Sequence, residues 1–281
     1  MRSALPLLLA SMLLPGQVPE EFALPANALA QEGGPRDWRV QVGAMVLALP
    51  KAPGSEEGRV LPWPVISAEY RDWLVLGASR IGLGAGATVR LVRQRAFGWD
   101  VGLGVGERRR EERADELAGM GDRDASLWAG TAFRVRAGNF GASLSWAAGL
   151  GQDSGTRATL SVGVGGRLQL RWHGSMALSA TLADARQMAF EFGVDPGQAA
   201  ARSRLISAGD PRLRTGEDGP FQPRAGLRDS AATITLSYAP DLRWRIFGLA
   251  RIERLGDQPS ASPLVRKPSQ GLLGAGFSCR L

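Results

Sequence analysis

The clearest pattern in the chain is a two-residue alternation of apolar with small or polar side chains, which recurs in about a dozen segments from Trp38 to the last residue. Strand side chains point alternately to opposite faces, so this pattern predicts β-strands with one apolar face. In residues 157–171, for example, leucine, valine and alanine alternate with arginine, threonine, serine and glutamine. Repeated segments of this kind are typical of a transmembrane β-barrel, whose strands face lipid outside and a polar lumen inside.

The last stretch of the chain, residues 269–281, indicates how such strands are arranged. Leu273, Phe277 and Leu281 fall on one face, whereas glycine, serine and arginine occupy most of the other. An unpaired apolar strand at a sheet edge recruits other chains, so this strand needs a permanent partner, which the first strand supplies. We therefore predict an all-β fold, a transmembrane antiparallel up-and-down β-barrel of about twelve strands, or ten if residues 79–82 form only a kink.

The connections between the alternating segments also alternate in length. Short ones lie near residues 71–72, 94, 138–139, 173 and 240–241, and long ones at 50–58, 106–124, 150–156, 185–228 and 254–269. Outer-membrane barrels have short periplasmic turns and longer external loops. The aromatic residues beside the short connections, which suit an interfacial belt, are Trp38, Tyr70, Trp73, Trp99, Trp172, Tyr238 and Trp244. Both asymmetries favour the bacterial outer membrane over the alternative of a soluble β-sandwich.

The segment 1–30 has the features of a secretory signal peptide. Arg2 precedes an apolar run from Ala4 to Leu14, and small residues at 28–30 suit cleavage. The apolar run is well short of the roughly twenty residues that a membrane-spanning helix needs, so an uncleaved anchor is the weaker alternative. We predict a signal peptide at 1–30 and an outer-membrane β-barrel at 31–281.

Charge and composition narrow the class of partner. The formal net charge is +7, and nearly all of the positive charge is arginine. A secretory leader and the spread of arginine over many strands argue against a nucleic-acid partner. Glycine is abundant, at 37 of 281 residues, which suits an all-β chain. Cys279, the single cysteine, has no partner for an internal disulfide, and we expect it to face lipid as a small apolar residue.

The polar face of the alternating segments carries many arginines and few acids. We predict that water fills the lumen or that these arginines pair across it. The residues predicted to line the lumen are Arg39, Arg90, Arg134, Arg136, Arg157, Arg167, Arg171, Arg243, Arg245 and Arg251.

No catalytic, cofactor-binding or metal-binding residues are predicted. A serine nucleophile needs an adjacent base, and His173, the single histidine, is expected in a short periplasmic turn away from outer-leaflet lipid. The acids Glu56 with Glu57, and Asp122 with Asp124, have the residue types of an acid/base pair or a calcium site, but solvated loop charge is the simpler interpretation. We therefore do not expect an enzyme.

Several stretches together resemble the MipA/OmpV outer-membrane proteins, also called the MltA-interacting protein family. The stretches that carry the resemblance are Ala52-Pro53-Gly54-Ser55-Glu56-Glu57, Arg59-Val60-Leu61-Pro62, Glu69-Tyr70-Arg71-Asp72-Trp73, Gly119-Met120-Gly121-Asp122, Phe192-Gly193-Val194, Gln198-Ala199-Ala200, Gly226-Leu227-Arg228-Asp229 and Ser262-Pro263-Leu264-Val265. Their order and spacing span nearly the whole chain after the leader. The non-aromatic last residue, Leu281, and the high arginine content are departures from the family.

The resemblance implies an outer-membrane barrel without known catalysis and without a cofactor. Its best-described member bridges a lytic murein transglycosylase and a bifunctional murein synthase, which is a penicillin-binding protein. We predict such a scaffold, whose periplasmic contact candidates are Asp72, Asn139, His173 and Asp241. Other expected partners are outer-membrane lipid and lipopolysaccharide, because the arginine-rich run at 108–113 lies in a long external loop. A self-paired, solvated loop is the alternative for that run.

A passive channel is the alternative function that the residues leave open. A lumen lined by arginine holds a positive potential that attracts anions. The lumen could also be closed, because the long segment 185–228 is able to fold inward as a plug. The resemblance therefore implies a scaffold or a stress-responsive outer-membrane protein, and the arginine-lined lumen leaves a weakly anion-preferring, porin-like channel as the alternative.

Overall fold

The computed structural model describes residues 37–78, 81, 84–106, 108–151 and 154–281. The predicted signal peptide, 1–30, lies outside the described residues, so its existence and cleavage stay predictions. Among the described helices, none has the length and apolar character needed to cross a membrane.

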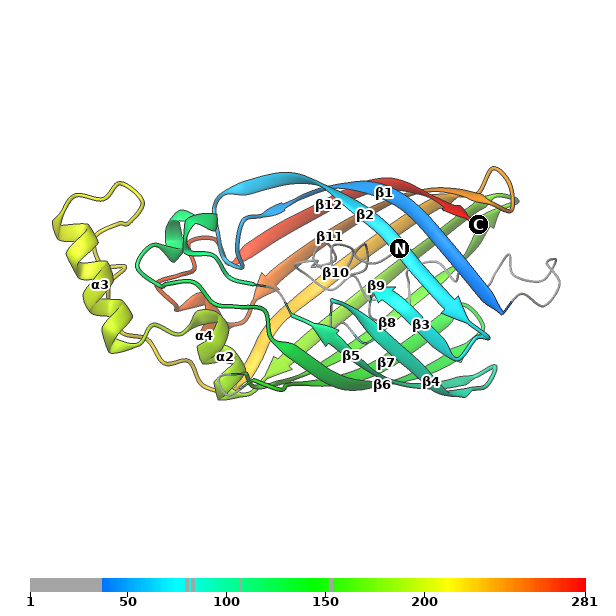
Figure 1. Ribbon diagram of the computed structural model, residues 1–281, viewed down its shortest axis with the longest axis horizontal. Coiled ribbons are helices and arrows are strands. Elements are labelled where there is room, and N and C mark those ends of the chain that lie inside the picture. The colour runs from blue at the N-terminus through cyan, green and yellow to red at the C-terminus, as the bar shows by residue number, and fades with distance from the viewer. Residues whose placement is uncertain (1–36, 79–80, 82–83, 107, 152–153) are drawn as a thin grey trace, which may run out of the picture.

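The described residues form one closed antiparallel barrel, in which each strand pairs with its neighbours in sequence and β12 returns to β1 (Figure 1). The strands are β1 (Trp38–Pro50), β2 (Gly58–Tyr70), β3 (Leu74–Ala78), β4 (Ala85–Arg93), β5 (Phe97–Val105), β6 (Leu127–Ala137), β7 (Phe140–Gly149), β8 (Thr156–Gln169), β9 (Trp172–Ala183), β10 (Gly226–Tyr238), β11 (Trp244–Leu255) and β12 (Ser269–Arg280). The all-β, up-and-down barrel expected from the alternation is therefore confirmed.

The strand count settles on twelve because the short segment after the first turn pairs on both sides. β3 has only five residues, yet Leu76 lies opposite Ala68 of β2 and Ala87 of β4. The ten-strand alternative is thus wrong. The barrel closes between β1 and β12, as predicted from the alternation in the last stretch of the chain. The pairs run from Gln41 opposite Arg280 to Ala48 opposite Leu273.

The faces of the strands follow the predicted alternation. On β8, Val162 is 47 % exposed on the outer surface, whereas its neighbour Ser161 is 3 % exposed on the inner one. On β12, Phe277 is exposed and Ser278 is buried. The outer surface of the barrel is consequently a continuous apolar surface suited to lipid, as strands that cross a bilayer require.

The two ends of the barrel differ as the connection lengths predict. The short turns lie at one end of the barrel, which we call the turn end. The first residue of β1, Trp38, and the last residue of β12, Arg280, lie at the same end. Aromatic rings gather there, with ring centroids of Trp38 and Tyr70 4.9 Å apart and those of Trp172 and Tyr238 5.0 Å apart. This arrangement forms the interfacial belt that the sequence predicts.

The long connections at the other end fold into a helical cap, whereas the alternation pattern predicts no helices there. Its elements are the short 3-10 helices η1 (Glu111–Arg113) and η2 (Asp115–Leu117) and the helices α2 (Ala185–Phe192), α3 (Pro196–Ser207) and α4 (Asp257–Ser260). Figure 1 shows α3 beyond the strands at this end. The expectation that 185–228 folds inward as a plug is therefore wrong for α3. A sequence signal exists, because Asp195 and Gln198 form a capping box with a proline at the first helical position.

Candidate functional site

The main feature inside the barrel is a cavity of about 1030 Å³. Residues of the short turns, such as Ala96 and Asn139, line it at one end, and cap residues such as Leu117 and Leu264 line it at the other. The cavity therefore extends along the barrel from the turns to the cap. We treat this lumen as the candidate functional site.

The wall of the cavity is strongly basic. Its lining includes fifteen arginine or lysine side chains and five carboxylates, which leaves an excess of ten positive charges. The five acids are Glu69, Asp100, Glu191, Asp229 and Glu253. A narrow space whose wall has one sign of charge and a low-dielectric surround concentrates ions of the opposite sign.

Part of this charge is paired near the short turns. Glu69 of β2 accepts from Arg90 of β4 and lies 3.2 Å from Arg39 of β1. Asp72, in the turn after β2, pairs with Arg39 and lies 3.0 Å from Arg93. These ion pairs tie β1, β2 and β4 together across the turn end.

A second pair lies on the wall formed by β5 and β6. Asp100 is only 2 % exposed and pairs with Arg134 of the neighbouring strand. A buried carboxylate needs such a partner, because an isolated charge is costly away from water. This pair explains why an acid is tolerated at an inward position among arginines.

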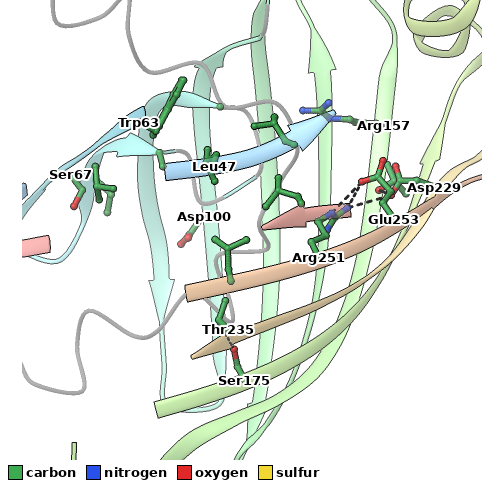
Figure 2. A pocket seen from close by; sticks show the side chains of 18 of the residues that line it. Leu47, Trp63, Ser67, Asp100, Arg157, Ser175, Asp229, Thr235, Arg251 and Glu253 are labelled. Atoms are coloured by element: carbon green, nitrogen blue, oxygen red, sulfur yellow. Dashed lines mark hydrogen bonds and ion pairs between the residues drawn. The ribbon is translucent and has the colours of Figure 1, made fainter. Parts of the chain in front are cut away.

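A third group of charges lies near the cap, on β10 and β11 and on α2. Arg251 lies 2.9 Å from Glu253 and 3.7 Å from Asp229, and Figure 2 shows the three side chains pointing toward one another. Arg228 donates to Glu191 at 2.6 Å and also pairs with Asp229. The group links α2 to the strands through the ion pair of Arg228 and Glu191.

The arginines predicted to line the lumen divide into two sets. Those that line the cavity are Arg90, Arg134, Arg136, Arg157, Arg167, Arg245 and Arg251. Arg39 lies beside the cavity in the ion pairs described above. Arg171 and Arg243, by contrast, are exposed residues of short turns, so their expected lumen-facing strand positions are corrected.

The cavity also contains an apolar strip that sequence reasoning missed. We use this name for the buried side chains of β1 and β12 and the partly buried ones packed on them from β2 and β11, namely Met45, Leu47, Leu49, Leu61, Trp63, Val65, Phe247, Leu249 and Leu272. Gly274 makes room for it, because a Cβ there would lie 2.9 Å from Leu47 and 3.2 Å from Leu249. The signal was the run at 44–49, which is apolar on both faces.

The predicted periplasmic contact candidates have different settings at the turn end. Asp241 caps its own turn, since its carboxylate accepts from the amides of Trp244 and Arg243, and these hydrogen bonds lower its pKa. Asn139 is an exposed turn residue, and Asp72 is held by arginines. His173 differs from the expectation, because it lies on β9 and lines the cavity instead of occupying a turn.

The acidic pairs of the external loops are bound to basic side chains instead of to each other. Arg214 donates to Glu56 and thereby lowers the pKa of that carboxyl, while Lys51 does the same for Glu57. Asp122 accepts from Arg110 at 2.8 Å. Across the described part of the chain, no three histidine, cysteine, aspartate or glutamate side chains gather in a way that could hold a metal ion.

A buried charge network holds the cap together. Arg202 of α3 is fully buried and donates to the carbonyl oxygens of Glu217, Glu116 and Ala118 at 2.7, 2.8 and 2.9 Å. Arg266 holds the two carboxylate oxygens of Glu217, each at 2.7 Å. The residues come from three separate loops, so the network could not be read from any one stretch of sequence.

Glu116 extends the cap network to the first long loop. Its carboxylate is 1 % exposed and accepts from Ser55 at 3.0 Å and from the amide of Glu56 at 3.0 Å. Arg266 lies 3.8 Å away. The four long loops that carry Ser55, Glu116, Arg202 and Arg266 therefore form one packed structure.

A closed antiparallel barrel with an apolar outer surface, aromatic short turns and long external loops defines an outer-membrane β-barrel protein. The family model described as MltA-interacting protein MipA matches residues 42–281. The chain therefore belongs to the MipA family, and the resemblance carried by its sequence stretches is confirmed.

Comparison with other proteins adds distant similarities. No curated protein matches the chain. Among solved structures, OmpT of Vibrio cholerae is 6 % identical over 87 % of this chain and 97 % of its own, with a TM-score of 0.38. The KdgM porin is 7 % identical over 85 % of this chain and 98 % of its own, with a TM-score of 0.39. OprB of Pseudomonas putida is 7 % identical over 87 % and 94 %, with a TM-score of 0.39.

Proposed function

We propose that this protein is a non-enzymatic outer-membrane scaffold that holds murein-remodelling enzymes near the membrane. The observation that carries the proposal is membership of a family described as MltA-interacting, over residues 42–281. The partner classes are a lytic transglycosylase and a bifunctional penicillin-binding protein. The barrel itself supplies a fixed anchor, because its closed ladder leaves no free edge.

The short-turn end is the surface available to such partners, since short turns of outer-membrane barrels face the periplasm. Asp72, Asn139 and Asp241 lie in three different turns of this end. The turns are small, whereas stable interfaces bury about 1,200–2,000 Å². The contact is therefore weak and relies on confinement to one membrane, which raises the effective concentration of a tethered partner.

Crosslinking in cells tests the scaffold. A photo-crosslinking residue is introduced at Asp72, Asn139 or Asp241, and Gly219, an exposed residue of the cap loop, is the matched control. We expect a murein hydrolase or synthase in the crosslinked products from the turn positions and not from Gly219. Recovery of no murein enzyme from any turn position contradicts the proposal.

Outer-membrane lipid is the second class of partner. Arg108 and Arg110 of the cap are about half exposed, although each also pairs with an acid, Arg108 with Asp124 at 3.6 Å and Arg110 with Asp122 at 2.8 Å. Arginine binds phosphate with two parallel hydrogen bonds, so the phosphates of lipopolysaccharide suit the outer face of this loop. Loss of lipopolysaccharide co-purification in an Arg108→Gln, Arg110→Gln variant is the expected result, and unchanged co-purification argues against it.

Anion passage is a second candidate function, favoured by the excess of ten positive charges on the cavity wall. The cavity is lined from the turns to the cap, which suits a route for small anions. Purified protein in a planar bilayer tests this function, with chloride expected to carry more current than potassium. Absence of conductance, or a preference for cations, removes it.

A further inference from the structure

A basic group lies at the turn end of the cavity, on the strands that follow one another from β8 to β11. Arg167 of β8 lies opposite His173 of β9, and Arg245 of β11 is close enough to interact electrostatically with His173. All three line the cavity. Within the described residues, no carboxylate lies within ion-pair distance of either arginine, in contrast to Arg90, Arg134 and Arg251.

A buried hydroxyl lies on β10, the strand between those that carry His173 and Arg245. Ser237 of β10 is opposite His173 and, on its other side, opposite Phe247 of β11. Its side chain is 2 % exposed, and its oxygen has no hydrogen-bond partner among the described residues. Buried hydroxyl groups normally have a partner, so this one, on the strand between those of His173 and Arg245, suits an oxygen atom of an anion bound by the basic group.

The apolar strip begins directly beside this basic group. Phe247 is opposite Gly276 of β12, which in turn is opposite Met45 of β1, and Met45 is opposite Trp63 of β2. The next inward positions bring Leu249, Leu47 and Leu61 together across Gly274 in the same way. On β11 alone, the apolar positions 247 and 249 separate Arg245 from Arg251, a span of roughly 20 Å at about 3.3 Å per residue.

This juxtaposition defines the chemistry of a ligand. A small inorganic anion would use the basic group and leave the apolar strip without a role, and a neutral hydrocarbon would use only the strip. We propose that the lumen binds a single-chain amphiphile with an anionic head, such as an alkyl phosphate. The head lies on Arg167, His173, Arg245 and Ser237, and the chain lies along the apolar strip toward the cap. The site is separate from the scaffold contacts and does not depend on them.

Photo-affinity labelling tests the site on the full protein reconstituted in lipid nanodiscs. The probe is decyl phosphate with a diazirine near the end of its chain, and the comparison probe has the same chain on a trimethylammonium head. We expect the anionic probe to label strip residues such as Met45, Leu47 and Phe247, mapped by mass spectrometry. The cationic probe should label them less by roughly ten-fold or more, because charge-assisted hydrogen bonds to the head are lost.

Paired variants separate the site from general membrane labelling. An Arg167→Gln, Arg245→Gln variant should reduce strip labelling by roughly ten-fold, whereas Arg171→Gln, Arg243→Gln, which removes the same charge from the exposed turns of the same end, should leave it unchanged. Heat-modifiable gel mobility verifies that both variants are folded. A Phe247→Ser variant, which keeps the basic group, should also reduce labelling.

Three results overturn the proposal. They are equal labelling of the strip by the cationic probe, displacement of the anionic probe by inorganic phosphate as well as by unlabelled decyl phosphate, and labelling confined to lipid-facing residues such as Leu273 and Phe277. None of these results bears on the murein-enzyme crosslinks. The amphiphile site and the scaffold role are therefore tested independently.

Discussion

Two buried arginines of the cap and three lumen arginines at the turn ends of β6, β8 and β11 have opposite surroundings. In the cap, Arg202 donates to three carbonyl oxygens and Arg266 holds both oxygens of Glu217. At the turn end, Arg136, Arg167 and Arg245 line the cavity, and no carboxylate of the described residues lies within ion-pair distance of them. Arginine therefore binds loops together in the cap, whereas at the turn end Arg39 and Arg90 pair with acids and the three arginines without an acid partner give the wall its positive charge.

The difference indicates which charges have a structural role. A buried arginine with several acceptors is matched to its surroundings, and its removal leaves those acceptors unsatisfied. An arginine that lines a cavity without an acid partner keeps its charge available for water or a ligand. Replacement should thus damage folding in the first case and change binding or ion preference in the second.

Removal of Arg202 should have the largest effect. In an Arg202→Leu variant the carbonyl oxygens of Glu116, Ala118 and Glu217 lose their donor, and removing one member of a buried charge network costs about 3–5 kcal/mol. We expect faster hydrogen exchange in residues 196–224 and unchanged barrel mobility on heat-modifiable gels. Arg204→Leu, on the exposed face of the same helix, is the control. Equal exchange in the two variants would mean that the network does not stabilise the cap.

Adjacent positions on β9 test the two faces of the strands that join these ends. Met176 is 55 % exposed on the lipid side, and Ser175 lines the cavity. Met176→Arg places a charge in lipid and should reduce the free energy of unfolding by about 2–4 kcal/mol. Ser175→Arg should cost about 1 kcal/mol, the value of its lost hydrogen bond to Thr235. Urea unfolding of the barrel in vesicles measures both, and equal losses would contradict the assigned faces.

Acid should loosen the cap before the barrel. Burial raises the pKa of Glu217, but hydrogen bonds from Arg266 and the amide of Arg214 outweigh it and hold the pKa below the ordinary value of 4.5. Stabilisation from a lowered pKa is complete above that value and is lost as the pH falls through the folded pKa. The protection of cap amides, taken relative to the intrinsic exchange rate at each pH, should therefore fall below pH 4.5, and a Glu217→Gln variant should show a smaller fall. An equal fall in protection in the natural protein and in the Glu217→Gln variant would argue against the role of Glu217.

Neutralising the turn-end arginines should have the smallest effect on stability and a measurable effect on ions. If the lumen conducts, Arg136→Gln with Arg245→Gln should lower the ratio of chloride to potassium permeability by a few-fold, because the wall loses positive potential. The change should shrink at high salt, where charges are screened over about 3 Å at 1 M. Arg204→Gln in the cap is the matched control. An unchanged permeability ratio in the double variant would mean that these arginines do not determine ion selectivity.

Much of the fold could be predicted from the sequence because strand periodicity is local. The alternation on β8 and β12, the alternating connection lengths and the aromatic turns need no knowledge of distant residues, and each is confirmed. The seven cavity-lining arginines follow from the same parity. Arg171 and Arg243 depart from it because β8 ends before Arg171 and β11 begins after Arg243, and strand ends are set by pairing with neighbours.

The lining of the lumen and the packing of the cap depend on contacts between segments that are distant in the sequence. The apolar strip requires β1 and β12, more than two hundred residues apart in sequence, to lie side by side, as Met45 and Gly276 do. The cap network joins Glu116, Arg202 and Arg266 from separate loops. Period-two alternation shows which side chains share a face of a strand. The sequence alone therefore determines that the strands form a barrel with an apolar outer face. Barrel closure and loop packing place those faces opposite one another, so only the tertiary structure decided which arginines are paired and where apolar side chains meet the lumen.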